Sequence, residues 1–157
     1  MLARPHGRCI ELYKNPKPTV DIAITDGKRV VVVKRKNNPF KGSWVLPGGF
    51  VEYGETVEKT AIREAKEETT IDIRLEGILG VYSAPDRDPR GHNISTVFVA
   101  EPVNGIPEGG DDAAEAEWRE ISSLQAGDLA FDHDLILKDL RSWLNQRESF
   151  WSTKLRE

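Results

Sequence analysis

Residues 55–68 concentrate acidic side chains at a spacing suited to binding a metal ion. Residues three and four apart share one face of a helix, so Glu64, Glu67 and Glu68 would project together if this segment is helical. Like charges at this spacing destabilise an isolated helix by about 0.2–0.5 kcal/mol per pair. Carboxylate oxygens suit a hard cation such as Mg²⁺, which usually joins carboxylates to substrate phosphates. The segment is predicted to bind such a cation; the alternative is a solvated acidic helix.

The elements around this segment are expected to place it at the edge of a core. A glycine-rich turn at residues 47–49 precedes a helix that begins near Thr56. The helix has an apolar stripe at helical spacing, which consists of Val57, Ala61, Ile62 and Ala65. The carboxylates beside this stripe are not expected to be free surface charges, because the edge of a buried face is a costly place for an unpaired carboxylate.

The spacing of the fixed residues carries a family resemblance. Counted from Gly49, the segment reads glycine, five residues, Glu55, seven residues, Arg63, Glu64, Ala65, one residue, Glu67, Glu68, one residue, Thr70 and Ile71. This pattern resembles the signature of the Nudix hydrolases at eight of its nine fixed or class positions. The departure is Thr70, where the family usually has glycine. A glycine there ends the helix in a left-handed conformation, so Thr70 should alter the cap without removing a ligand.

The resemblance implies a fold and a set of site residues. The fold would be an α/β/α sandwich with a mixed central sheet and the loop-helix-loop of the signature. Mg²⁺, with Mn²⁺ as an alternative, would be held by the Gly48 carbonyl and by Glu64, Glu67 and Glu68. An ion pair between Arg63 and Glu55 would orient Glu64 and tie the loop to the helix.

The sequence alone does not identify the general base. Family members use either a glutamate of the signature or an acid from a later loop. Asp111 and Asp112, which follow two glycines and precede Trp118, are the later candidates. The alternative is that they form a solvated turn.

Residues outside the signature must recognise the substrate. Arg35 ends a predicted buried strand, and Phe40 and Tyr82 could stack on a base. The loop at residues 82–92, YSAPDRDPRGH, offers donors suited to phosphate or ribose from Arg87, Arg90 and His92. This loop and the FDH sequence at residues 131–133 resemble the ADP-ribose pyrophosphatase branch of the Nudix family. A surface turn and a packed helix start are the alternatives.

Hydrophobic periodicity predicts the remaining elements of an α/β fold. Four consecutive valines at residues 30–33 indicate a strand buried on both faces. Residues 102–114 should be loop. Strands are expected at residues 19–25, 29–36, 44–46, 71–82, 94–100 and 116–121, and a second helix at residues 131–144 with Asp132 as its N-cap.

Composition limits the class of protein. The 157 residues suit one domain, with an N-terminal arm at 1–17 and a C-terminal tail at 145–157. A net charge of −4 argues against a general nucleic-acid binder. One cysteine, Cys9, excludes an internal disulfide and favours a reducing, cytoplasmic setting. No apolar run suggests a membrane span. A homodimer through Phe150 and Trp151 of the tail is an open alternative to a monomer.

The expected function is therefore Mg²⁺-dependent hydrolysis of a nucleotide, with ADP-ribose giving AMP and ribose 5-phosphate. One alternative is hydrolysis of another nucleoside diphosphate derivative or of a damaged nucleoside triphosphate. A second is a non-catalytic Nudix module that senses a nucleotide.

Overall fold

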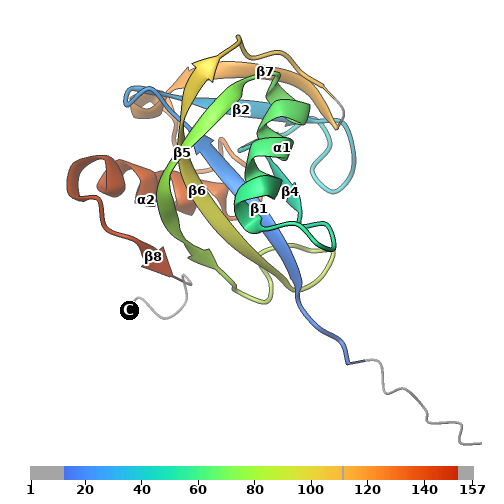
Figure 1. The fold of residues 1–157 in the computed structure, drawn as a ribbon. Helices are drawn as coiled ribbons and strands as arrows, with labels where there is room; N and C mark the ends of the chain where they lie inside the picture. The colour runs from blue at the N-terminus through green and yellow to red at the C-terminus, as the bar shows by residue number, and fades with distance from the viewer. Residues whose placement is uncertain (1–12, 111, 152–157) are drawn as a thin grey trace, which may run out of the picture.

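The fold places a sheet between two helices (Figure 1). The computed structural model describes residues 13–110 and 112–151. In chain order, the elements are β1 (Lys17–Ile24), β2 (Arg29–Arg35), β3 (Trp44–Val45), β4 (Gly48–Phe50), α1 (Val57–Thr69), β5 (Asp72–Tyr82), β6 (Asn93–Asn104), β7 (Ala113–Glu120), the 3-10 helix η1 (Ile121–Ser123), α2 (His133–Gln146) and β8 (Phe150–Trp151).

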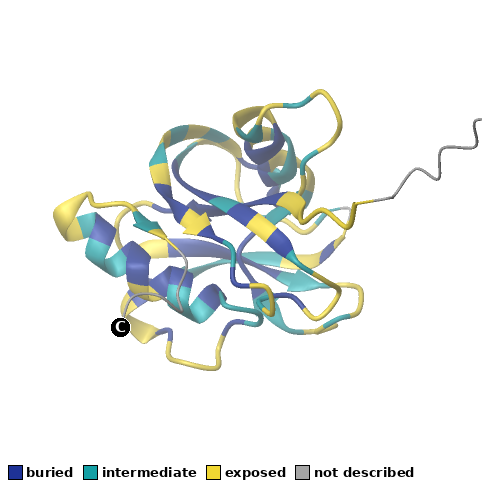
Figure 2. Cartoon of the chain, turned by 90° about the horizontal axis from the view of Figure 1, so that it is seen from below, coloured by how far each residue is buried: buried dark blue, intermediate teal, exposed yellow. Residues whose placement is uncertain are grey.

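Each helix covers its own side of the strands. Val20, Ile22 and Ile24 of β1 share a core cluster with Ala61 and Ala65 of α1. The other core cluster joins neighbouring β1 and β6 positions to Ile136, Leu140 and Trp143 of α2. Successive strand residues point to opposite faces, so one strand serves both clusters. The predicted α/β/α sandwich is confirmed, and Figure 2 shows the buried strands between half-buried helices.

The strands form two sheets rather than one. The larger has the order β4-β1-β6-β5-β8 and is mixed, because β1 runs parallel to β6 and antiparallel to β4. The smaller is antiparallel, with the order β3-β2-β7. An isolated bridge between Thr25 and Val30 links them at the Asp26-Gly27 turn, where Gly27 has a φ of 91°. The four valines of β2 are buried, as the sequence predicts.

Several predicted boundaries are wrong. The glycine-rich turn is itself a short strand, β4, because Gly48 and Gly49 pair with β1. The loop expected at residues 102–114 is shorter, since β6 continues to Asn104 and β7 begins at Ala113. Ile62 does not belong to the buried stripe of α1 and is 48% exposed. Thr60 takes a buried position instead, with its hydroxyl bonded to the Glu55 carboxylate and the Thr56 carbonyl.

The end of the chain differs from the predicted exposed tail. Phe150 is half-buried against the α2 core cluster, and β8 pairs with β5, whereas Trp151 is 65% exposed. The homodimer stays a prediction.

Cys9 and residues 152–157 of the tail lie outside the described residues, as does most of the predicted arm. Among the helices that the structure describes, none has the length and apolar character needed to cross a membrane.

A buried hydrogen bond joins β5 to α2. The Tyr82 hydroxyl donates to the Asp139 carboxylate at 2.6 Å, and both residues are buried. We expect Tyr82→Phe to lower the free energy of unfolding by about 1–3 kcal/mol, because it removes a donor from a buried carboxylate. Urea denaturation followed by tryptophan fluorescence would measure this. Tyr53→Phe is the control, since Tyr53 is fully exposed and its change should stay within about 0.5 kcal/mol. Equal stability of the two variants would contradict this prediction.

Candidate active site

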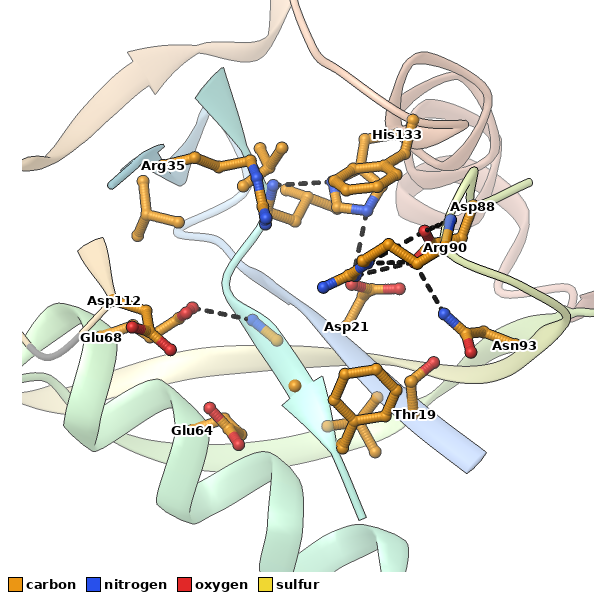
Figure 3. Close-up of a pocket in the computed structure, with 18 of the residues that line it drawn as sticks. Thr19, Asp21, Arg35, Glu64, Glu68, Asp88, Arg90, Asn93, Asp112 and His133 are labelled. Atoms are coloured by element: carbon orange, nitrogen blue, oxygen red, sulfur yellow. Dashed lines mark hydrogen bonds and ion pairs between the residues drawn. The ribbon is translucent and has the colours of Figure 1, made fainter. Parts of the chain in front are cut away.

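A cavity of about 340 Å³ opens where the ends of several elements meet. β1, β2, β4, α1, the loop at residues 83–92 and the start of α2 all contribute to its lining. Glu64 and Glu68 of α1 lie at one end, and Arg90 and Asn93 lie at the other beside Asp21 and Asp88 (Figure 3). The cavity therefore offers an acidic end and an end where arginine and amide donors accompany two further carboxylates.

The start of α1 is fixed by capping. The Thr56 hydroxyl accepts from the Lys59 N–H at 3.2 Å, which satisfies one of the free donors of the first turn. Ala61 and Ala65 hold the helix against β1. This packing turns Glu64 and Glu68, which lie one turn apart, toward the cavity.

The glycines let the backbone of β4 lie directly against these two carboxylates. The Gly48 N–H donates to Glu68 Oε2 at 3.0 Å. A Cβ at Gly49 would overlap the Glu64 carboxylate, and a Cβ at Gly48 would lie 2.7 Å from Asp21 Oδ1. A side chain at Gly49 would therefore displace the Glu64 carboxylate, and one at Gly48 would collide first with the Val20 backbone carbonyl of β1.

The two glutamates at the acidic end of the cavity have raised pKa values. Burial, together with the neighbouring charges of Glu64, Asp21 and Asp112, raises the pKa of Glu68 to about 8, although the hydrogen bond from the Gly48 N–H lowers it. Burial also raises the pKa of Glu64, with contributions from Glu67 and Asp112 that the Arg63 contacts oppose. Oxygen ligands that gather in this way suit a hard divalent cation, whose charge would relieve their repulsion. The donor set therefore fits Mg²⁺ or Mn²⁺.

Arg63 supplies positive charge beside these carboxylates. Its guanidinium contacts Glu55 at 2.9 Å, Glu64 at 2.8 Å and Glu67 at 3.1 Å. Hydrogen bonds from Arg63 lower the pKa of Glu55 to about 2, although desolvation opposes this. The same pairing raises the pKa of Arg63. The structure thus contains the ion pair between Arg63 and Glu55 that the resemblance implies.

Glu67 does not join Glu64 and Glu68 at the cavity. Its side chain is 40% exposed, is absent from the lining and pairs with Arg63. Among the residues that the structure describes, no three acidic, histidine or cysteine side chains converge into a preformed metal site. The Arg63 guanidinium holds Glu67 at the outer edge in this structure, so the assignment of Glu67 as a third helix ligand stays a prediction.

Asp112 lies at the acidic end of the cavity, close to Glu68 (Figure 3). Its carboxylate accepts from Asn37 Nδ2 at 3.0 Å. Asp111, the other predicted base from this loop, lies outside the described residues. Asp112 is thus the later-loop candidate whose position is known.

Arg35 and Arg90 both line the cavity. Arg35 Nε donates to the Pro39 carbonyl at 2.7 Å, and its guanidinium lies 5.1 Å from the centre of the Phe131 ring. Arg90 pairs with Asp88 at 2.7 Å and lies 5.5 Å from the Phe50 ring and 5.8 Å from the Phe131 ring. Half-exposed guanidiniums beside aromatic rings can bind phosphate and stack on a base.

Burial corrects one predicted substrate contact. Tyr82 is completely buried in the α2 core cluster and cannot stack on a base. The Arg87 side chain is only 6% exposed, and its guanidinium binds Asp132 at 2.7 Å and Asp21 at 3.3 Å. Arg87 nevertheless lines the cavity, so its contact with substrate stays a prediction. The Asp132 carboxylate accepts from Arg87 and makes no side-chain cap of α2. His92 contacts the Ser83 carbonyl at 3.1 Å and closes its own loop.

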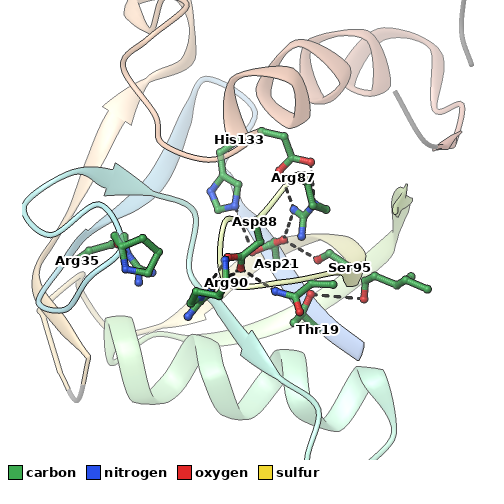
Figure 4. A network of polar contacts seen from close by, with 12 residues as sticks. Thr19, Asp21, Arg35, Arg87, Asp88, Arg90, Ser95 and His133 are labelled. Atoms are coloured by element: carbon green, nitrogen blue, oxygen red, sulfur yellow. Dashed lines mark hydrogen bonds and ion pairs between the residues drawn. The ribbon is translucent and has the colours of Figure 1, made fainter. Parts of the chain in front are cut away.

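A buried network supports this side of the cavity (Figure 4). His133 Nδ1 accepts from the Leu46 N–H at 2.9 Å, which leaves the Nε2 proton to face Asp21 Oδ1 at 3.4 Å. The Ser95 hydroxyl also donates to Asp21, at 2.6 Å. Burial alone would raise the pKa of Asp21, but His133, Arg87 and Ser95 together hold it well below its usual range. The network joins β1, β6, α2 and the loop at residues 83–92.

Sequence reasoning missed several cavity residues. Asp21 interrupts the apolar residues Val20 and Ile22 of a buried strand, a pattern that could have marked it. Asn93 donates to Asp88 at 2.7 Å, and Phe131 has a φ of 58°, which is unusual for a bulky residue. Phe131 belongs to the FDH sequence that carries the family resemblance, whereas no pattern in the sequence marks Asn93.

Comparisons with known proteins agree with this geometry. The NUDIX domain model matches residues 15–140. An ADP-ribose pyrophosphatase of Methanocaldococcus jannaschii is 52% identical over 134 residues, 85% of this chain and 78% of that protein. The ADPR responsive transcriptional repressor NtrR of Acinetobacter baylyi is 32% identical over 147 residues, 88% of this chain but only 58% of the repressor.

A solved structure supports the same assignment. The NUDIX domain of Shewanella oneidensis NrtR complexed with ADP ribose aligns with a TM-score of 0.73 at 27% identity, covering 84% of this chain and 90% of that one. The fold, the spacing of the acidic helix and the family model over residues 15–140 lead to one conclusion. This chain belongs to the Nudix family of hydrolases.

Proposed function

We propose that this protein is a metal-dependent Nudix hydrolase that cleaves ADP-ribose into AMP and ribose 5-phosphate. The observation that carries the proposal is the two-ended cavity, with Glu64 and Glu68 at one end and Arg35 and Arg90 nearer the other. A diphosphate linked to two ribose groups has matching chemistry, because its anionic centre needs cations and its sugars need hydrogen-bonding partners. The similarity to the M. jannaschii ADP-ribose pyrophosphatase supports this substrate.

The residues that would hold the metal are Glu64, Glu68 and the Gly48 carbonyl. Glu67 stays a proposed ligand that would have to exchange Arg63 for the cation. A bound Mg²⁺, or Mn²⁺, neutralises phosphate charge and polarises the oxygens around the reacting phosphorus. Arg63 keeps Glu55 and Glu64 in fixed orientations, which supports ligand geometry.

Asp112 is the proposed general base. It would accept a proton from the water that attacks one phosphorus, while the bond from that phosphorus to the bridging oxygen breaks. The bridging oxygen leaves on the other phosphate, so one water molecule yields AMP and ribose 5-phosphate. Arg35 and Arg90 would orient the substrate, and Phe50 and Phe131 offer ring faces beside them.

A second candidate function is nucleotide sensing without turnover. The similarity to the ADPR responsive repressor NtrR favours this alternative, but the chain spans only 58% of that protein. We rank hydrolysis first because Glu64 and Glu68 both line the cavity and Arg63 pairs with Glu64. We also propose a cytoplasmic location, in keeping with a single cysteine and a nucleotide substrate.

Substrate choice can be tested directly. We expect ADP-ribose with Mg²⁺ to be hydrolysed faster than nucleoside triphosphates or dinucleotides, with AMP and ribose 5-phosphate as the products. Chromatography of the products from a matched panel, with and without EDTA, would measure this. A faster reaction with another diphosphate derivative would replace ADP-ribose as substrate, and no metal-dependent turnover of any member would favour the sensing function.

The proposed ligands can be separated from other helix carboxylates. We expect Glu64→Gln and Glu68→Gln each to lower kcat/KM for ADP-ribose by more than the 10–100-fold typical of residues that only orient ligands. Glu58→Gln is the matched control, because Glu58 is exposed on the same helix and does not line the cavity. Steady-state kinetics would measure kcat/KM, and circular dichroism would check that each variant is folded. Full activity in Glu64→Gln would contradict the ligand assignment.

Metal binding should also stabilise the fold. At a hundred times its Kd, Mg²⁺ is expected to raise the free energy of unfolding by about 2.7 kcal/mol, since it binds the folded acidic cluster and not the unfolded chain. Thermal unfolding in MgCl₂ and in KCl of equal ionic strength would isolate this effect from screening. The gain should shrink in the variant that combines Glu64→Gln with Glu68→Gln; an undiminished gain would place the metal elsewhere.

A further inference from the structure

Thr70 ends α1 in a conformation that favours glycine. Its φ is 63° and its ψ is 0°, and its N–H donates to the Lys66 carbonyl at 3.0 Å. A residue with a Cβ is strained in this left-handed region, whereas glycine is not. Glycine would therefore make a less strained helix cap than threonine. The threonine side chain at this position needs another explanation.

The Thr70 side chain contacts the segment that follows β6. Its hydroxyl donates to the Ile106 carbonyl at 2.9 Å. Beside it, the Glu108 N–H donates to the Thr69 carbonyl at 3.0 Å. A Cβ at Gly110 would overlap the Glu67 carbonyl. Residues 105–110 therefore lie directly on the last turn of α1, and Thr70 provides the side-chain hydrogen bond of this contact.

This segment leads to Asp112. The Asp112 carbonyl accepts from the Lys36 N–H at 3.1 Å, and its carboxylate accepts from Asn37. Asp112 then faces the same cavity as Glu64 and Glu68 (Figure 3). The helix that carries the proposed metal ligands thus also holds, at its end, the segment that delivers the proposed base.

We propose that Thr70 is a positioning residue for catalysis, whose hydroxyl holds residues 105–110 on the end of α1 and thereby keeps Asp112 at a fixed place opposite Glu64 and Glu68. The proposal rests on the proposed function, in which Asp112 takes the proton from the attacking water. It gives this chain's departure from the usual glycine a catalytic role rather than a stabilising one.

Three substitutions separate the hydroxyl from the backbone strain. Thr70→Ala removes the hydroxyl and keeps the strain, Thr70→Gly removes both, and Thr70→Ser keeps both. We expect the alanine and glycine variants to lose about 10-fold or more in kcat for ADP-ribose with KM within about two-fold, because a small misplacement of a reacting group is costly. The serine variant should remain within about two-fold of the wild type.

Stability provides the contrast with a merely structural role. Thr70→Gly should melt at a higher temperature than Thr70→Ala, because only the alanine variant retains the strain. If Thr70 served stability alone, activity would follow this order and the glycine variant would be the more active one. Equal losses of kcat in both variants are expected instead, and wild-type kcat in both would overturn the proposal.

A double-mutant cycle and an amide probe complete the test. In an Asp112→Asn background, Thr70→Ala should reduce kcat by less than about two-fold further, and an undiminished further loss would overturn action through Asp112.

Hydrogen exchange at the Glu108 N–H should be faster in Thr70→Ala and Thr70→Gly but not in Thr70→Ser. Unchanged exchange would overturn the proposed contact role.

The same measurements keep the two proposals apart. Wild-type turnover by Asp112→Asn would refute the general-base assignment, and with it the catalytic role of Thr70, whatever the amide probe reports. Loss of turnover in Asp112→Asn together with full turnover in Thr70→Ala and Thr70→Gly would refute only the role of Thr70.

Discussion

The close contact between the backbone of β4 and two carboxylates of α1 is the constraint on which the site depends. Gly48 donates to Glu68, and Gly49 leaves space that only a missing side chain provides beside Glu64. The pairing of β4 with β1 and the packing of α1 on β1 both serve this contact. Moving either element by the size of one methyl group would separate the strand from the acids.

Charge balance follows from the same arrangement. Burying several carboxylates near one another is costly unless cations or hydrogen-bond donors accompany them. Arg63 meets this need on the outer side of α1, and Arg87 with His133 meets it around Asp21 in the lining of the cavity. Glu64, Glu68 and Asp112 leave excess negative charge in the space between them, and this is where a divalent cation fits.

The sequence predicted the type and order of the helices and strands better than the residues at which they begin and end. The periodicity of α1 and the valines of β2 identified a helix and a doubly buried strand. The short strand β4 could not be predicted, because two glycines carry no strand preference and their pairing with β1 is a tertiary contact. Tyr82 was misassigned for a similar reason, since a polar tip at the end of a strand does not reveal whether it points inward.

The sequence by itself determined the reacting segment, because its residues lie within one short stretch and helical spacing fixes which of them share a face. The ion pair between Arg63 and Glu55 was implied by the resemblance to the Nudix signature, since the two residues are eight positions apart and Glu55 lies before the helix begins. Only the tertiary structure decided that Tyr82 is buried, that Arg87 pairs with Asp132 beside the cavity, and that Thr70 meets Ile106. Partners such as Arg87 and Asp132, 45 positions apart, are matched by the folding of the whole chain, and no local pattern of residues encodes that match.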